Sequence, residues 1–295
     1  MSFEVTYMKK TCKLVKKLEQ LLKQLNCRSY LHHFGPKKYK LKHHLLALLM
    51  MQAYKLSLRR IESLLRMFEI KVPTFSALCY RRKKIPSWIW NNLIQLTAGL
   101  KHKNVAVDST GFSTSNPSLH YVKRIDKNNQ IKYYAKLSMF YGIDNRKVIA
   151  VKIHSKPRHD IKDVKPLLGS YCRMQCLLAD KAYDAEWLHE WCFWKGIQTQ
   201  IPSKAWTKRG FFRKKQRKNF TEEKYHQRSL IESGFSAMKR KYGGSVLGRS
   251  LSSISTEIYC KAIAYNLSLR GLEIFNRALS LQYLYKMHLN SLAKK

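Results

Sequence analysis

The chain has 295 residues, of which 45% are apolar and 12% aromatic, enough to bury one sizeable core or a core with a smaller domain. This composition excludes a disordered basic tail. With 57 lysines and arginines against 18 aspartates and glutamates, the formal net charge is +39, which indicates a polyanionic partner. Nucleic acid is the strongest candidate, because many cations can displace the counterions of a phosphate backbone. An anionic membrane surface is the weaker alternative.

The sequence predicts neither a membrane span nor an export signal. No apolar run reaches the roughly 18 residues that a spanning helix needs, and the N-terminal MSFEVTYMKK lacks the apolar core of a signal peptide. Seven scattered cysteines indicate a reduced, intracellular protein. A zinc site built from Cys172, Cys176, His189 and Cys192 is disfavoured, because neither cysteine pair has the usual CxxC spacing.

Residues 1–100 are predicted to form a basic helical region. Apolar residues recur at three- and four-residue spacing over 41–54 and 57–70, and a short basic helix follows over 75–85, with Thr74 or Ser76 near its N-cap. Two helices, a tight break and a third helix predict a helix-turn-helix-like DNA-binding unit. A plain helical bundle with a solvated basic face fits the same pattern equally well.

Residues 101–275 are predicted to form an α/β domain. Strand-like segments occur at 104–108, 133–143, 147–153, 175–180 and 196–202, and helical patterns at 160–168 and 187–194. Their alternation indicates an α/β core whose first three strands follow one another in hairpin order. Two more helices are expected at 253–275 and 277–292, the second within a C-terminal helical tail over 276–295.

The segment YHQRSLIESGFSAMK, residues 225–239, combines acid, base and apolar side chains at helical spacing. At about 100° per residue, four polar side chains fall within roughly 60° of one another: Tyr225, Arg228, Glu232 and Lys239. The adjoining apolar stripe contains Ile231, Phe235, Met238 and Tyr242. We expect the stripe to pack on the α/β core and the polar ridge to remain accessible.

Three acids stand out by position. Asp108 and Asp180 each end an apolar strand, and Glu232 lies on the polar ridge. Strand ends in open α/β sheets are where ligands bind, and adjacent strands would bring the two aspartates together. Clustered carboxylates repel one another unless a cation neutralises them, and hard oxygen ligands suit Mg²⁺ or Mn²⁺. In so basic a protein, these acids predict two-metal phosphoryl transfer on nucleic acid.

Three sequence blocks resemble the DDE transposases of prokaryotic insertion sequences, in the large group usually numbered four and five. VAVDSTGFS, which contains Asp108, resembles the first aspartate block of that family, and LLADKAYD, which contains Asp180, resembles the second. Tyr225, Arg228, Glu232 and Lys239 match the signature Y-x2-R-x3-E-x6-K. His159 and Asp160 also resemble a recurring pair of the group. The resemblance covers roughly residues 104–265.

The resemblance implies an RNase H-like catalytic core, a mixed sheet flanked by helices, beside an N-terminal helix-turn-helix-like DNA-binding domain. It implies Asp108, Asp180 and Glu232 as catalytic residues that hold two Mg²⁺ or Mn²⁺ ions. The implied reaction hydrolyses the phosphodiester at the element ends, and the exposed 3′-hydroxyl then attacks target DNA. Because no covalent protein–DNA intermediate is implied, Tyr225 is assigned to positioning or stacking on DNA.

The same resemblance implies DNA contacts for Arg228 and Lys239. The basic run 208–218 includes Phe211 and Phe212, which favours a DNA-backbone contact over a purely solubilising loop. The candidate contacts in this run are Arg209, Arg213, Lys214 and Lys215. Implied partners are the terminal inverted repeats and target DNA, with a homodimer or larger synaptic complex, in the nucleoid-associated cytoplasm of a prokaryote.

Each of these features has an alternative. Arg228 and Glu232 could be a surface pair worth only about 0.3–0.5 kcal/mol, although the order Arg before Glu is the less favourable one on a helix. A DNA-binding regulator derived from a transposase but lacking catalysis is the main alternative function. A nuclease with the same core but no strand transfer is a third.

Overall fold

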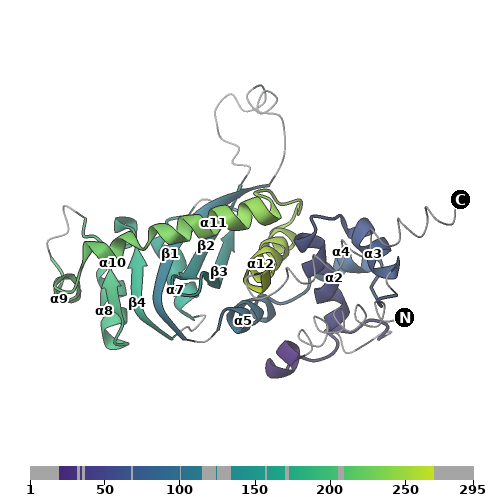
Figure 1. Cartoon of the computed structure of the whole chain (residues 1–295), viewed down its shortest axis with the longest axis horizontal. Helices are drawn as coiled ribbons and strands as arrows, with labels where there is room; N and C mark the ends of the chain where they lie inside the picture. Colours follow the sequence, from purple (N-terminus) through teal and green to yellow (C-terminus); the bar gives the residue numbers. More distant parts are fainter. Residues whose placement is uncertain are drawn as a thin grey trace, which may run out of the picture.

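The centre of the protein, seen in a computed structural model, is a five-stranded mixed sheet of strand order β3-β2-β1-β4-β5 (Figure 1). The structure describes residues 20–31, 34, 37–67, 69–99, 101–114, 124, 134–156, 158–169, 173–204 and 209–268. The strands are β1 (Lys101–Ser113), β2 (Tyr134–Gly142), β3 (Lys147–His154), β4 (Arg173–Ala179) and β5 (Gln198–Gln200). β1, β2 and β3 are antiparallel neighbours, whereas β4 runs parallel to β1 and β5. The predicted α/β core with three strands in hairpin order is confirmed.

Helices cover both faces of this sheet, because side chains alternate along β1. Ala106 and Phe112 face one core, and Val105 and Val107 face the other. Packed on the first face are α11 (Ser229–Tyr242), α12 (Leu251–Ser268) and α5 (Ser87–Ala98). Packed on the second are α7 (Ile161–Gly169) and α8 (Glu186–Trp194). The two faces of β1 therefore present side chains to different sets of helices.

The N-terminal helices extend the first core rather than forming a separate one. They are α2 (Leu41–Ala53), α3 (Leu58–Met67) and α4 (Phe75–Arg82). One hydrophobic cluster runs from Leu22 through α2 to α12, which lies between the sheet and these helices (Figure 1). Arg82 on α4 also pairs with Glu257 on α12 at 3.2 Å. Thr74 accepts the Ala77 amide at 3.4 Å, so the predicted N-cap of α4 is confirmed.

Some elements differ from the sequence-based expectation. The structure adds α5, and also α9 (Phe211–Arg217) within the basic run. It divides the expected helix at 225–239 into α10 (Glu222–His226) and α11, because the amides of Arg228, Leu230 and Ile231 bond three residues back instead of four. The tail at 276–295, the helix at 277–292, Cys172 and Lys208 lie outside the described residues. Among the described residues, no helix is long and apolar enough to cross a membrane.

Candidate active site and nucleic-acid interface

Asp108 and Asp180 lie at neighbouring positions where the parallel pairing of β1 and β4 ends. β4 stops at Ala179, but β1 continues to Ser113, so the prediction that Asp108 ends its strand is wrong. The last aligned pair of β1 and β4 is Val107 with Ala179, and Asp108 and Asp180 are the next residues of the chain after these two. Asp180 begins the short 3₁₀ helix η1 (Lys181–Tyr183) and its Oδ1 accepts the Lys181 amide at 2.6 Å. The Asp108 Oδ1 accepts the Ser109 amide at 2.8 Å. The strand register thus brings together two acids that are 72 positions apart in the sequence (180 − 108).

Arg228 joins Asp108 to Glu232. Its Nη1 lies 3.1 Å from the Asp108 Oδ2, and its Nη2 lies 3.1 Å from the Glu232 Oε1. The side chain of Asp108 is 24% exposed and that of Glu232 is 61% exposed, so the pair opens to solvent on the Glu232 side. Arg228 lies at the N-terminal end of α11, where the chain turns from α10. One guanidinium therefore bridges an acid of β1 and an acid of α11.

The electrostatics show that all three acids act on this guanidinium. Burial works against the charge of Arg228, but Asp108, Tyr225, Glu232 and Asp180 together hold the pKa of Arg228 above its ordinary value. Burial raises the pKa of Asp108, while the Ser109 amide and Arg228 oppose that rise. Nearby Asp160 and Glu232 raise the pKa of Asp108 further. This corner of the sheet therefore favours an added positive charge.

The donor chemistry of this corner fits a hard divalent cation. Asp108, Asp180 and Glu232 supply carboxylate oxygens, the ligands that Mg²⁺ and Mn²⁺ prefer. Among the residues that the structure describes, no group of three or more His, Cys, Asp or Glu side chains is arranged as a metal site. In this conformation, Arg228 is the cation that neutralises two of the three acids.

A polar network lies behind Asp108, on the opposite face of the sheet. The Ser109 hydroxyl lies 2.8 Å from the Ser138 hydroxyl, which donates to the Asp163 Oδ2 at 2.7 Å. Asp163 on α7 is fully buried, and Lys136 approaches the same Oδ2 at 3.1 Å. Burial favours the neutral acid, but hydrogen bonds from Ser138 and Lys136 hold the pKa of Asp163 below its usual value. Sequence reasoning missed this network.

His154 and Asp160 border that network. The His154 Nε2 lies 2.9 Å from the Asp163 Oδ1, close enough for an ion pair but without the angles of a hydrogen bond. Burial lowers the pKa of His154, while Asp163 opposes that shift. Lys136 pairs with Asp160 at 2.7 Å. An acid on the buried face of α7, next to Val164, was the sequence signal that could have revealed the network.

Lys239 and Tyr225 flank the Arg228 corner on α11 and α10. The Lys239 Nζ donates to the Thr110 hydroxyl at 2.6 Å and lies 5.4 Å from the centre of the Phe112 ring. Burial lowers the pKa of Lys239. The Tyr225 ring lies 5.8 Å from the Phe220 ring. Asp108, Thr110 and Phe112 alternate onto the face of β1 that α11 covers. Arg228 and Lys239 therefore contact the same face of this strand, through Asp108 and Thr110.

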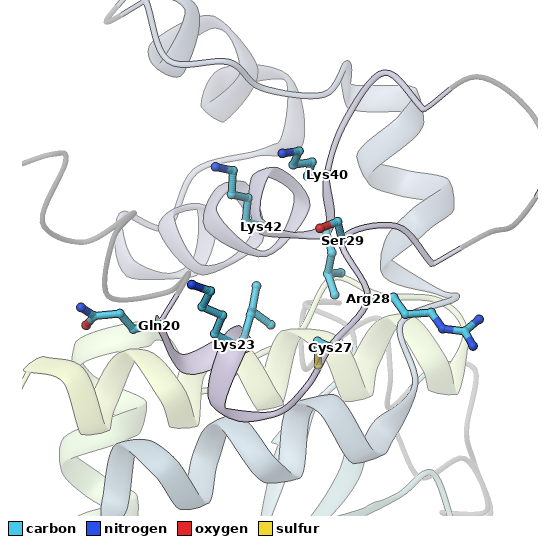
Figure 2. A pocket seen from close by; sticks show the side chains of 9 residues that line it. Gln20, Lys23, Cys27, Arg28, Ser29, Lys40 and Lys42 are labelled. Carbon is cyan, nitrogen blue, oxygen red and sulfur yellow. The ribbon is translucent and has the colours of Figure 1, made fainter.

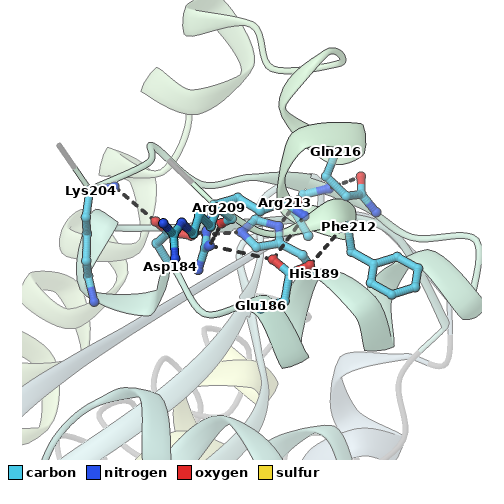
Figure 3. Close-up of polar contacts among 9 residues, drawn as sticks. Asp184, Glu186, His189, Lys204, Arg209, Phe212, Arg213 and Gln216 are labelled. Carbon is cyan, nitrogen blue, oxygen red and sulfur yellow. Dashed lines mark hydrogen bonds and ion pairs between the residues drawn. The ribbon is translucent and has the colours of Figure 1, made fainter. Parts of the chain in front are cut away.

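The cations of the basic run differ in their surroundings. Arg213 is 11% exposed, with its Nε 2.6 Å from the Asp184 Oδ1 and its Nη1 3.6 Å from the Glu186 Oε2 (Figure 3). Asp184 is fully buried and also takes the His189 Nε2 at 3.1 Å and the Lys204 amide at 3.0 Å. Arg213 is thus engaged within the fold and anchors α9 beside α8.

The other candidate cations of the basic run face solvent: Arg209 and Lys214 are exposed. Lys215, also exposed, lies 4.3 Å from the centre of the Phe193 ring.

A basic hollow of about 480 Å³ lies among the N-terminal residues. Its lining includes Lys23, Arg28, Lys40 and Lys42. Figure 2 shows Lys23, Lys40 and Lys42 extending to the same side, whereas Arg28 points the other way. The hollow concentrates positive charge in the region where the sequence predicts DNA binding.

Comparisons with known proteins identify the family. A profile of the transposase DDE domain matches residues 99–267, a span that contains Asp108, Asp180 and Glu232. A search of curated proteins found no match. Among solved structures, the chain is similar to a piggyBac transposase in a cryo-electron microscopy synaptic complex with hairpin DNA. That similarity has a TM-score of 0.42 at 10% identity and covers 92% of this chain and 73% of the other.

Proposed function

The chain belongs to the family of transposase DDE domains, and on that premise we propose that it catalyses cut-and-paste transposition of an insertion sequence. The proposed reaction is hydrolysis of the phosphodiester at the element ends, followed by transfer of the 3′-hydroxyl into target DNA. The observation that carries the proposal is the β1–β4 register, which sets Asp108 beside Asp180 with Glu232 joined to Asp108 through Arg228.

In the proposal, Asp108, Asp180 and Glu232 are the catalytic residues and hold two Mg²⁺ or Mn²⁺ ions. When bound, such ions activate the attacking oxygen and stabilise the leaving oxygen. Arg228 orients Asp108 and Glu232, and its charge offsets the repulsion between the two acids. Lys239, held against Thr110, provides positive charge beside β1 for the DNA backbone, and Tyr225 offers a ring for stacking.

The fold and partners follow from the same proposal. The strand order β3-β2-β1-β4-β5, with the first three strands antiparallel, supports an RNase H-like core over residues 101–275. The basic hollow supports DNA binding by the N-terminal region. Arg209, Lys214 and Lys215 remain proposed DNA contacts because they are exposed. Terminal inverted repeats and target DNA are the proposed substrates, in a dimeric or larger complex.

The test is cleavage of linear DNA that carries the element's own inverted repeats, with Mg²⁺ or Mn²⁺. We expect the wild-type chain to nick these ends, and Asp108→Asn and Glu232→Gln each to lose at least about 10³-fold in rate, because electrostatic stabilisation of the reacting phosphate supplies several kcal/mol of catalysis. Glu69→Gln, at an exposed acid on the N-terminal side of the molecule, is the matched control and should cleave normally.

The outcome also separates the alternatives. Salt-dependent DNA binding with no cleavage by any variant would favour a non-catalytic regulator and contradict the proposal. Supplying pre-cleaved ends and a target plasmid distinguishes a transposase from a nuclease, since only a transposase joins the two.

A further inference from the structure

A groove of about 560 Å³ lies between α7 and α8, on the opposite face of the sheet from Arg228 and Glu232. Its lining includes Trp187, Trp191 and Trp194, which recur along α8 at four- and three-residue spacing. This spacing places all three rings on one side of the helix. The groove is therefore a concave surface walled largely by indole rings.

The groove continues into a cluster of phenylalanine rings. Trp194 lies 5.5 Å from Phe193 and 6.0 Å from Phe212, and Phe212 lies 5.2 Å from Phe211, measured between ring centres. Trp194 is 71% exposed and Phe211 is 68% exposed. Large apolar side chains are rarely so exposed together in the absence of a binding partner. Ring contacts between α8 and α9 thus produce one continuous exposed aromatic surface.

Cations border this surface. Lys165 lies 5.1 Å from the centre of the Trp187 ring, and Lys215 lies 4.3 Å from Phe193 and 5.8 Å from Phe211. Lys195 also lines the groove, against a single acid of the lining, Glu190. Arg213 holds α9 beside α8 through its pairs with Asp184 and Glu186 (Figure 3). The surface pairs flat apolar rings with positive charge.

We infer that this aromatic groove is a second DNA-binding surface that takes unpaired nucleotides, with bases stacked on Trp194 and Phe211 and phosphates beside Lys165, Lys195 and Lys215. Paired bases hide their faces inside the duplex, so exposed rings select single strands, while the lysines supply attraction to any phosphate backbone. A protein partner would have to be acidic to match the same lysines. The inference rests on the proposed function only in taking DNA as the ligand.

The test measures binding without cleavage, so a failure of the catalytic proposal would not affect it. Fluorescence anisotropy in EDTA compares three labelled probes of equal length: oligothymidine, an abasic oligonucleotide and a duplex. We expect the variant Trp194→Ala with Phe211→Ala to bind oligothymidine about tenfold or more weakly, because each stacked base contributes a factor of this order. Affinity for the abasic and duplex probes should change less than about twofold.

Trp88→Ala is the matched control, because Trp88 is 49% exposed on α5, away from the groove. It should bind all three probes as the wild type does. Equal affinity of the double variant and the wild type for oligothymidine would overturn the inference, as would an equal loss for all three probes. Sedimentation of the wild type and the double variant tests whether a second copy of this chain occupies the groove instead. If the double substitution changes the oligomeric state but not oligothymidine binding, the groove is a self-association surface and the inference is wrong.

Discussion

Arg213 and Arg228 each lie between two acids, but their surroundings are opposite. The Arg213 side chain is 11% exposed and that of Asp184 is fully buried. Asp184 has further partners in His189 and the Lys204 amide. Arg228 bridges Asp108 and Glu232 at the rim of the sheet, where the Glu232 side chain is 61% exposed. The first cluster is closed within the fold, whereas the second opens to solvent.

This difference separates a structural ion pair from a candidate catalytic one. A buried charge that loses its partner is left uncompensated, so the Arg213 cluster contributes to stability only as a complete set. The acids beside Arg228 retain solvent access, and Asp108 directly follows the last residue of β1 that pairs in parallel with β4. The burial of each cluster and its position in the sheet, more than its ion-pair chemistry, therefore indicate which cluster can act on DNA.

Arg213→Met removes the buried cation of the first cluster. We expect this substitution to lower the free energy of unfolding by about 3–5 kcal/mol, because it leaves the fully buried Asp184 without its strongest partner. Urea denaturation followed by circular dichroism measures the change. DNA cleavage by the fraction that remains folded should persist.

Arg228→Met is the matched partner of that experiment. It should cost about 1 kcal/mol or less in stability, since both acids keep access to water, while cleavage of the element ends falls sharply. Equal loss of stability in the two variants would contradict the distinction between a structural and a catalytic cluster.

The sequence predicted the Asp108, Asp180 and Glu232 neighbourhood because local patterns determine it. Each of two apolar runs is followed by an acid, and the parallel pairing of these runs in β1 and β4 brings the two acids to neighbouring positions. The four-residue spacing of Arg228 and Glu232 likewise predicts a contact on any helix, and the structure shows it at 3.1 Å.

Which cations are buried and which helices pack together depends on tertiary contacts that a single sequence does not show. Arg213 and Lys214 are neighbours in one basic run and carry the same sequence signal. Only the phase of α9 and the position of Asp184 bury the first and expose the second. The packing of the N-terminal helices against α12 is another such contact, although α2, apolar on nearly every side, indicates a helix buried all round.

Gly234 tests whether the Arg228 corner depends on how closely α11 approaches the sheet. A Cβ at this position would lie 2.7 Å from the buried Tyr141 ring on β2. We expect Gly234→Ala to destabilise the protein by about 1–2 kcal/mol, since overpacking outweighs the gain in helix propensity. It should also slow cleavage, because the displaced helix carries Arg228 and Glu232.

Ser233→Ala is the control for that substitution, at an exposed neighbouring position on α11. It gains helix propensity without a clash, so stability should stay equal or rise. If Gly234→Ala matched Ser233→Ala in thermal melting and in cleavage, the spacing between α11 and β2 would have no part in forming the corner.

Lys261 on α12 is a buried cation that contrasts with Arg213, and its replacement has the smallest expected effect on stability. Burial lowers the pKa of Lys261 to about 8, although Glu257 opposes the shift, and its Nζ donates to the carbonyl oxygens of Gly243 and Ser245 at 2.8 and 2.6 Å. An unfolded lysine has a pKa of about 10.4, so between about pH 8 and 10.4 the unfolded chain binds more protons and stability rises with pH. Below about pH 8 both states are protonated and the destabilisation is complete.

We therefore expect the stability of the wild type to gain on that of Lys261→Met as the pH rises from 7.5 to 9.5, by at most about 1.4 kcal/mol per pH unit. Urea midpoints at several pH values for both proteins measure the difference, and subtraction cancels the other groups that titrate there. Parallel profiles would show that Lys261 keeps its proton in the fold. A buried lysine can relieve its cost by losing a proton, whereas a guanidinium cannot, which explains why Arg213 needs two acids and a closed network.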